Sequence, residues 1–201
     1  MKKRVSFFID GFNLYHSIRT HAPNCRWINL RKLCEQLLKT DEEIADIYYF
    51  TAYTYWNAEK LRKHKIYVKA LSTEKIKPVF GKFKKVTRFC SACKSQYIAH
   101  EEKRSDVNIT LYLFEEAMKD TFDSAIIVSG DSDLLPVIEM VRNNFGKYIG
   151  IALPMGRQSE EMKEESDFVI KIKRQHLTQS LFPKTISIND ETIECPADNW
   201  V

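Results

Sequence analysis

Apolar residues follow two patterns that alternate along the chain. In the first, apolar residues stand together with little interruption, which predicts short strands buried on both faces. Such strands are expected at Val5–Ile9, Ile44–Tyr53, Ala125–Ser129, Tyr148–Leu153 and Phe168–Ile172. In the second, apolar residues recur every three or four positions, which predicts helices. These are expected from Asn13 onward and at Leu30–Leu38, Asn57–Ala70, Ser105–Met118, Leu134–Asn144, Gln158–Glu165 and Gln175–Leu181.

Strands that alternate with helices and are apolar throughout are typical of a parallel sheet with helices on both faces. The segment from Ile76 to Ile98 departs from this pattern, because Pro78, Gly81 and two cysteines break it into short pieces. Here we expect a strand followed by a β-hairpin whose turn holds the cysteines. The predicted class is therefore α/β, with one domain over 1–182, a small basic hairpin inserted at 76–100, and an irregular tail over 183–201.

The composition is that of an ordinary soluble globular protein. The 201 residues, 44% of them hydrophobic and 29% charged, suffice for one domain with a sizeable core. No apolar run is long enough to span a bilayer. The N-terminal apolar run is too short for a signal peptide and ends at Asp10. We therefore expect a cytoplasmic protein with no membrane association, and its five cysteines do not form a disulfide framework.

Positive charge is concentrated in one stretch. Between Lys60 and Lys94 there are twelve basic residues and one acid, Glu74, whereas the rest of the chain carries 19 basic and 26 acidic residues. Aromatic residues are interleaved with this charge, which favours a polyanionic partner over the alternative, a solvated surface loop. These aromatic residues are Tyr67, Phe80, Phe83 and Phe89. The candidate phosphate-binding residues are Lys60, Arg62, Lys63, Lys82, Lys84, Lys85 and Arg88.

Acidic residues follow two predicted strands directly. The first strand ends at Asp10, and the strand Ala125–Ser129 is followed by Asp131 and Asp133. A further acid, Asp106, opens a predicted helix. Ligands of open α/β sheets bind outside the carboxyl ends of the strands, where these positions can converge.

Carboxylates gathered within a few ångströms repel one another, and a divalent cation removes that repulsion. Mg²⁺ and Mn²⁺ prefer oxygen ligands, and a pair of such ions can promote displacement at a phosphodiester. The alternative is that these acids only cap helices, because Asp is a preferred N-cap. Acid-bearing turns at three separate places favour the metal site. The predicted ligands are Asp10, Asp106, Asp131 and Asp133, with Asn13 as a neutral ligand or an orienting group.

Three segments, FFIDGFNLYHSI, EEKRSDVNITLYLF and IIVSGDSDLLPVI, together resemble the NYN domain of the PIN-like nuclease superfamily, in its bacterial LabA-like branch. The resemblance runs from about Arg4 to Arg174. It implies a Rossmann-like parallel sheet and a ribonuclease site that depends on Mg²⁺ or Mn²⁺. The Arg104-Ser105 pair stands where relatives often have a less bulky turn. By motif, the matching residues are Asp10 and Asn13, then Asp106, then Asp131 with Asp133.

The residues and the resemblance together predict an endoribonuclease that hydrolyses RNA phosphodiester bonds. Asp10, Asp106 and Asp131 would hold the metal, Asp133 would be a further ligand or support, and the basic segment would bind the RNA backbone. The alternative is a catalytically weak RNA-binding or regulatory protein of the same fold. The preference for RNA over DNA rests on the resemblance.

Cys90 and Cys93 form a C-x-x-C pair between the two expected hairpin strands. A structural zinc needs four ligands, so this pair supplies half of a site. His100, Cys25, Cys34 or a second copy of the chain would have to complete it, which makes a homodimer one of the expected partners. The alternative is a pair of reduced thiols, and a redox motif fits less well because no helix starts at the pair.

Overall fold

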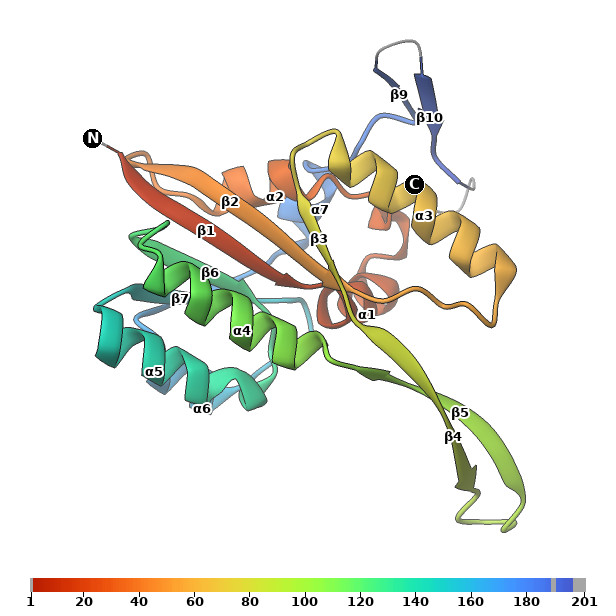
Figure 1. Ribbon diagram of the computed structural model, residues 1–201. Coiled ribbons are helices and arrows are strands. Elements are labelled where there is room, and N and C mark those ends of the chain that lie inside the picture. The colour runs from red at the N-terminus through yellow and green to blue at the C-terminus, as the bar shows by residue number, and fades with distance from the viewer. Residues whose placement is uncertain (1, 189–190, 197–201) are drawn as a thin grey trace.

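A six-stranded parallel sheet lies at the centre of the computed structural model, which describes residues 2–188 and 191–196. Its strand order is β3-β2-β1-β6-β7-β8 (Figure 1). All the strands predicted from apolar runs belong to it. They are β1 (Lys3–Asp10), β2 (Glu42–Thr51), β6 (Ser124–Val128), β7 (Tyr148–Leu153) and β8 (Phe168–Lys171), and β3 (Lys77–Phe80) is the sixth strand.

Helices cover both faces of the sheet, as predicted. Phe7 and Phe8 are neighbours on β1 and are both fully buried, so they enter two different hydrophobic clusters. The Phe7 cluster is completed by α1 (Gly11–His21), α2 (Leu30–Leu37), α3 (Ala58–Ser72) and α7 (Arg174–Thr178). The Phe8 cluster is completed by α4 (Ser105–Met118), α5 (Leu135–Phe145) and α6 (Glu160–Glu165). The predicted Rossmann-like α/β class is confirmed.

Two short 3₁₀ helices, η1 (Pro23–Cys25) and η2 (Ser132–Leu134), complete the helical elements of the described residues. Within this part of the chain, no helix combines the length and the apolar character needed to cross a membrane.

The strand order reverses at β1. The chain runs outward from β1 through β2 and β3, and then returns to place β6 on the other side of β1. The carboxyl ends of β1 and β6 are therefore adjacent, with Ile9 paired with Val128. Such a reversal of strand order is where open α/β sheets bind ligands.

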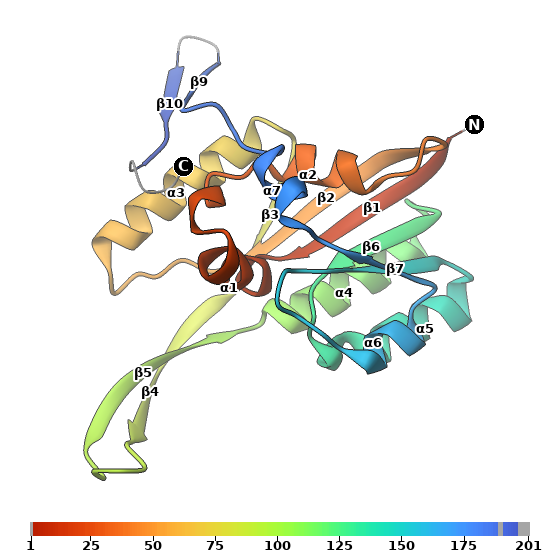
Figure 2. The same ribbon diagram turned by 180° about the vertical axis from the view of Figure 1, so that it is seen from behind.

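The inserted hairpin consists of β4 (Lys82–Phe89) and β5 (Gln96–Lys103), which pair only with each other. It extends away from the sheet, as both Figure 1 and Figure 2 show. It spans 82–103 rather than 76–100, because Lys77–Phe80 pairs with β2 as an edge strand of the central sheet. The hairpin therefore starts where the sheet ends and leads directly into α4.

The prediction of an irregular tail after Pro183 is wrong for the part that the structure describes. An antiparallel hairpin forms there, consisting of β9 (Thr185–Ile188) and β10 (Glu191–Glu194). Lys69 of α3 pairs with Glu191 at 2.7 Å, and Ile193 is buried against the core. Two strands of four residues form only a marginal hairpin by themselves, and the contact with α3 supports this one. Residues 197–201 of the predicted tail lie outside the described residues.

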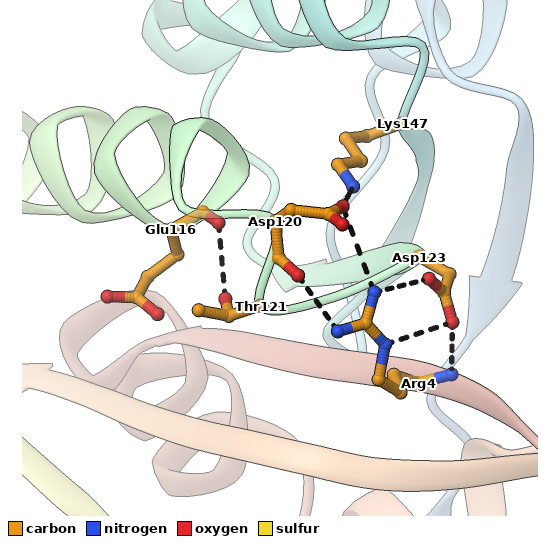
Figure 3. A network of polar contacts seen from close by, with 6 residues as sticks. All are labelled: Arg4, Glu116, Asp120, Thr121, Asp123 and Lys147. Atoms are coloured by element: carbon orange, nitrogen blue, oxygen red, sulfur yellow. Dashed lines mark hydrogen bonds and ion pairs between the residues drawn. The ribbon is translucent and has the colours of Figure 1, made fainter.

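Arg4 and Asp123 join β1 to the start of β6 at the end of the sheet opposite Asp10 (Figure 3). Arg4 Nη2 and Nε donate to the Asp123 carboxylate at 2.7 and 3.3 Å, and the Arg4 backbone N–H donates to it at 2.8 Å. Arg4 Nη1 also donates to the carbonyl of Asp120, whose carboxylate pairs with Lys147. These contacts hold the two strands in register, and so align their carboxyl ends.

Candidate active site

Asp10 is the last residue of β1 and the N-cap of α1. Its Oδ1 accepts hydrogen bonds from the backbone N–H groups of Phe12 at 3.0 Å and Asn13 at 2.9 Å, and its Oδ2 accepts one from the Ser129 hydroxyl at 3.0 Å. The residue is only 5% exposed. Burial raises the pKa of this carboxyl more than the hydrogen bonds lower it, and the charge of Asp131 raises it further. Capping therefore explains one oxygen of Asp10, while the other is held by the neighbouring strand.

Gly11 allows the start of α1 to lie close against β2. A Cβ atom at this position would be 2.5 Å from the carbonyl oxygen of Phe50 and 2.7 Å from the ring of Tyr49. A side chain here would push α1 away from the sheet. The Asp-Gly pair therefore both caps the helix and fixes its position.

The turn after β6 contacts the first motif directly. The Ser129 hydroxyl accepts a hydrogen bond from the N–H of Asp131 at 3.2 Å while donating to Asp10. The N–H of Gly130 donates to Asn13 Oδ1 at 3.3 Å. One hydrogen-bonded turn thus connects three of the predicted site residues, namely Asp10, Asn13 and Asp131.

Asp131 also has a capping role. It is the N-cap of η2, and its Oδ1 accepts a hydrogen bond from the N–H of Asp133 at 3.1 Å. The side chain of Asp133 is exposed at the same turn. Capping accounts for Asp131 but not for a second acid two residues later.

The start of α4 brings Asp106 to the same region. Burial raises the pKa of the Asp106 carboxyl, and the negative charges of Asp10, Asp131 and Asp133 raise it further. Four carboxylates from three separate segments therefore act on one another at the reversal point of the sheet.

Asp106 is not the cap of its helix, so the capping alternative fails at this position. Glu102 Oε1 accepts hydrogen bonds from the N–H and the hydroxyl of Ser105, at 3.2 and 2.8 Å. Arg104 occupies the N-cap position with φ = 86°, a left-handed conformation that is unfavourable for a residue with a Cβ atom. Asp106 lies in the first turn of α4, where the helix dipole favours negative charge.

The chemistry of these donors matches a hard divalent cation, because they are carboxylate and amide oxygens whose charges repel one another. Their present arrangement does not surround one. Among the described residues, no three His, Cys, Asp or Glu side chains are placed so that they could hold a metal ion together. Both oxygens of Asp10 accept hydrogen bonds from the protein instead.

Comparison with protein families identifies the fold. The model of the NYN domain matches residues 4–173, which extends from β1 beyond β8. This chain belongs to the NYN domain family. NYN domains are generally nucleases that act on RNA and typically use divalent metals. The resemblance to a PIN-like NYN domain is thereby confirmed, and the assignment to the LabA-like branch stays a prediction.

Two individual proteins are similar to this NYN domain. The 6-hydroxy-3-succinoylpyridine 3-monooxygenase HspA of Pseudomonas putida is 24% identical over 211 residues, which cover 87% of this chain and 67% of that protein. The crystal structure of a protein of unknown function from Vibrio parahaemolyticus matches with a TM-score of 0.59 and 18% identity, over 86% of this chain and 94% of that one. The second likeness shows the fold alone.

A cavity of about 590 Å³ adjoins the carboxylates of the NYN domain. It lies among α1, the end of β2, α3 and the base of the hairpin. Phe12, which follows Asp10 by two residues, is in its wall, and so is Glu102. Burial raises the pKa of the Glu102 carboxyl, and the charge of Asp106 also raises it. The wall of the cavity therefore includes residues close in sequence to Asp10 and to Asp106, although neither of these acids lines it.

Sequence reasoning missed two charged residues here, Glu102 and Arg157. The Arg157 side chain packs on the turn after β6, since a Cβ atom at Gly130 would be 3.0 Å from its Cβ. Its positive charge lowers the pKa of His16, after burial and the charge of Arg19. Arg157 follows the carboxyl end of β7, and a basic residue at a strand end is the signal that could have identified it.

The predicted RNA-binding residues of α3 lie on two sides of the helix. Lys60 and Lys63 line the cavity, although Lys63 also pairs with Glu59 at 2.6 Å. Arg62 instead borders a separate hollow beside β10. The helix therefore directs Lys60 and Lys63 toward the acids and Arg62 away from them.

The predicted RNA-binding residues of β4 are also divided between two faces. Lys85 lies on the face that carries Phe83, and its cross-strand partner His100 lines the cavity. The alternate positions lie on the opposite face, where Arg88 pairs with Glu101. These alternate positions are Lys82, Lys84 and Arg88.

Cys90 and Cys93 lie in the turn at the tip of the hairpin. Hydrogen bonds from Ser95 and Cys90 lower the pKa of the Cys93 thiol to about 7. Of the proposed completing ligands, Cys25 and Cys34 are buried in the core.

The third proposed completing ligand, His100, is engaged elsewhere. Its ring stacks on Trp56 with a centroid separation of 3.8 Å. In the part of the chain that the structure describes, Cys90 and Cys93 thus have no third metal ligand beside them.

Proposed function

We propose that this NYN domain is a metal-dependent endoribonuclease that hydrolyses RNA phosphodiester bonds. The observation that carries the proposal is the turn at the reversal point of the sheet, where the Ser129 hydroxyl donates to Asp10 and accepts from the N–H of Asp131. The start of α4 adds Asp106, whose pKa is raised by burial and then by the charges of Asp10 and Asp131. Repelling carboxylates cost free energy unless something positive binds between them. Membership of a family of RNA nucleases supports the same conclusion.

Asp10, Asp106 and Asp131 would hold Mg²⁺ or Mn²⁺, with Asp133 as a further ligand or support. A divalent cation bound there supplies positive charge and Lewis acidity at the phosphodiester. Asp106 and Asp133 are exposed, so their side chains are free to turn toward a cation. Asp10 is fixed by its three hydrogen bonds, which lower its pKa against the effect of burial and favour the ionised form.

Other residues of the chain would bind and orient the RNA. Asn13 is oriented by the N–H of Gly130, and Arg157 over the same turn would contact a phosphate. Lys60, Lys63 and Lys85 would bind the backbone on the side of the cavity. The reaction needs no covalent intermediate with the protein.

The alternative is an RNA-binding or regulatory protein of the same fold with little activity. Clustered carboxylates argue against it, because negative charge weakens binding to phosphates unless a cation neutralises it. The monooxygenase activity of the Pseudomonas putida relative is not transferred to this chain at 24% identity.

A cleavage assay tests the proposal. The full chain is incubated with single-stranded RNA and DNA of one sequence, in Mg²⁺, Mn²⁺ or EDTA. We expect metal-dependent cleavage of RNA that falls to background in Asp10→Asn and Asp131→Asn. Asp41→Asn is the matched control, because Asp41 is exposed in the loop before β2. Full activity in both site variants overturns the mechanism, and RNA binding without cleavage in any metal supports the alternative.

A further inference from the structure

The cavity beside the carboxylates has the size and lining of a ligand pocket. Its volume of about 590 Å³ lies within the range of small-molecule sites. Aromatic rings from four different elements line it: Phe12 of α1, Tyr49 of β2, Tyr67 of α3 and Phe83 of β4. Aromatic walls of this kind favour a flat ring as the ligand.

Two polar groups in this lining are buried without a partner. Arg26 Nε and Thr54 Oγ1 have no hydrogen-bond partner among the described residues, and both residues line the cavity. A buried polar group left unsatisfied costs about 1–3 kcal/mol. Both unsatisfied groups belong to residues that line the same cavity. A ligand with polar edges bound there could form hydrogen bonds with both groups.

The cavity is also positively charged. Arg19, Arg26 and Lys60 are in its lining, and Glu102 is the acid that faces them. His64 hydrogen-bonds with Thr51 at 3.1 Å, and burial lowers the pKa of His64 to about 4. Because Nε2 of its neutral imidazole is engaged with Thr51, Nδ1 is left to donate or accept one hydrogen bond at the edge of a nucleobase. The ligand indicated is therefore anionic, aromatic and polar at its edge.

A line of aromatic rings leads from the hairpin to the acids. Trp56 stacks on His100 with an interplanar angle of 9° and contacts Phe83 edge to face at 4.6 Å. Phe83 in turn contacts Phe12 at 5.4 Å, two residues from Asp10. Trp56 nevertheless remains 45% exposed. Exposed rings of this kind stack with unpaired bases.

We infer that this cavity binds one unstacked nucleotide of a single-stranded RNA substrate, base inward, so that the adjoining phosphate reaches Asp10. The inference rests on the proposed function, because it names the substrate class of the same site. Arg26, Thr54 and His64 contact the base edge, and the adjoining rings of Phe12 and Phe83 form a wall against one of its faces. Arg19 and Lys60 contact its phosphate. Double-stranded RNA, whose bases are stacked and paired, does not fill the cavity.

Titration with mononucleotides tests this without cleavage. The full chain in EDTA is titrated calorimetrically with AMP, GMP, CMP and UMP, and with ribose 5-phosphate, which lacks a base. We expect saturable binding, about tenfold or more tighter for at least one nucleotide than for ribose 5-phosphate, which is the effect of one base-edge hydrogen bond. Equal binding of ribose 5-phosphate overturns base recognition. Equally tight binding of salicylate overturns the assignment to a nucleotide in favour of a small aromatic acid.

Two variants locate the binding. Thr54→Val removes a hydroxyl that has no partner, so the variant should fold with an unchanged or higher thermal midpoint. We expect it, and Arg26→Gln, to weaken nucleotide binding about tenfold. Arg174→Gln is the control, because Arg174 is exposed on α7 and does not line the cavity. Unchanged binding in both cavity variants overturns the inference.

Asp131→Asn separates this inference from the proposed function. It should lose RNA cleavage and still bind mononucleotides. Binding that persists in a wild-type chain without ribonuclease activity overturns only the proposed function. Cleavage by a wild-type chain that binds no mononucleotide overturns only the pocket.

Discussion

Ser129 donates a hydrogen bond to Oδ2 of Asp10 at 3.0 Å, and this contact joins the ends of two neighbouring strands inside the site. The same hydroxyl accepts the N–H of Asp131 at 3.2 Å. One small side chain therefore positions two of the acids on which the proposed chemistry depends.

Ser129→Ala should affect both stability and the pH dependence of cleavage. The hydrogen bond lowers the pKa of Asp10, so without it that pKa rises further. The acidic limb of the pH–rate profile should then move to higher pH, while the free energy of unfolding falls by about 1–2 kcal/mol. Ser124→Ala is the control, because Ser124 is equally buried on the same strand and donates to the carbonyl of Tyr148. It should lose similar stability with no change in the pH profile, and an identical profile for both variants contradicts the role of Ser129.

Asp106→Asn should stabilise the metal-free protein at neutral pH. Burial and the charges of Asp10, Asp131 and Asp133 raise the pKa of Asp106, so its ionisation opposes folding. This cost is absent below the unfolded pKa of about 3.9 and grows as pH rises through the folded pKa. The thermal midpoint of the variant in EDTA should therefore exceed that of the wild type at pH 7 and match it near pH 4. The difference should be small, because solvent screens an exposed side chain.

Metal supplies a second readout for the same variant. Mn²⁺ that binds only the folded state raises the thermal midpoint of the wild type, and should raise that of Asp106→Asn less. Equal rises in both proteins would remove Asp106 from the ligand set.

Asp123→Asn should show the opposite pH dependence. Hydrogen bonds from Arg4 lower the pKa of Asp123, so its ionised form stabilises the fold. That stabilisation is present above the unfolded pKa and is lost as pH falls through the folded pKa. The variant should lose about 1 kcal/mol or less at pH 7, since both side chains are 40% exposed, and nothing at pH 2–3. Chemical denaturation at the two pH values measures this, and the Asp123 substitution should cost less in an Arg4→Met background, where the backbone N–H of residue 4 still donates to Asp123.

Gly11→Ala should be more damaging than a typical glycine substitution. Its Cβ atom would meet the carbonyl of Phe50 at 2.5 Å, and the resulting displacement of α1 should cost about 1–3 kcal/mol and reduce cleavage. Gly146→Ala is a useful comparison, because Gly146 has φ = 61° and open space around it. It should cost about 1 kcal/mol through the backbone alone and leave cleavage unchanged. Equal activity in both variants would show that α1 tolerates displacement.

Zinc bound by Cys90 and Cys93 has a predictable stoichiometry. Because the described residues place no third ligand with the pair, four-coordinate zinc would be shared between two hairpin tips. Protein purified without chelator should then hold about one zinc per two chains and form a dimer that Cys93→Ser dissociates. Less than about a tenth of an equivalent shows that the thiols are free, and one zinc per chain contradicts sharing.

The central sheet and its acids were predictable from short-range patterns. The strands around Phe7 and Ile126 are buried on both faces, and so stand out as continuous apolar runs. Because parallel strands end at one edge of the sheet, Asp10 and Asp131 could be placed together before any contact was known. Asp106 does not follow a strand, and it was added because it opens a predicted helix and lies in the middle one of the three motifs.

The rest of the site depends on contacts between distant segments. Arg26 and Thr54 stand in loops with no periodic pattern, and they share a cavity only because α1 and α3 cover the same face of the sheet. Glu102 lies beyond the hairpin predicted from the sequence, and only the structure shows that it lies near the end of β5 and caps the following helix. The two faces of β4 likewise become distinct only when Phe83 meets Phe12.

The central position of β1 determines when the site can form during synthesis. Asp10 leaves the ribosome early, but its partner Ser129 follows 119 residues later. β2 can pair with β1, and β3 with β2, in the meantime, whereas the other edge of β1 stays uncovered until β6 emerges. A nascent or truncated chain that stops before β6 therefore carries Asp10 and Asp106 without Ser129 and Asp131. Under the proposed function, the acids of the site can meet only after most of the domain has been translated.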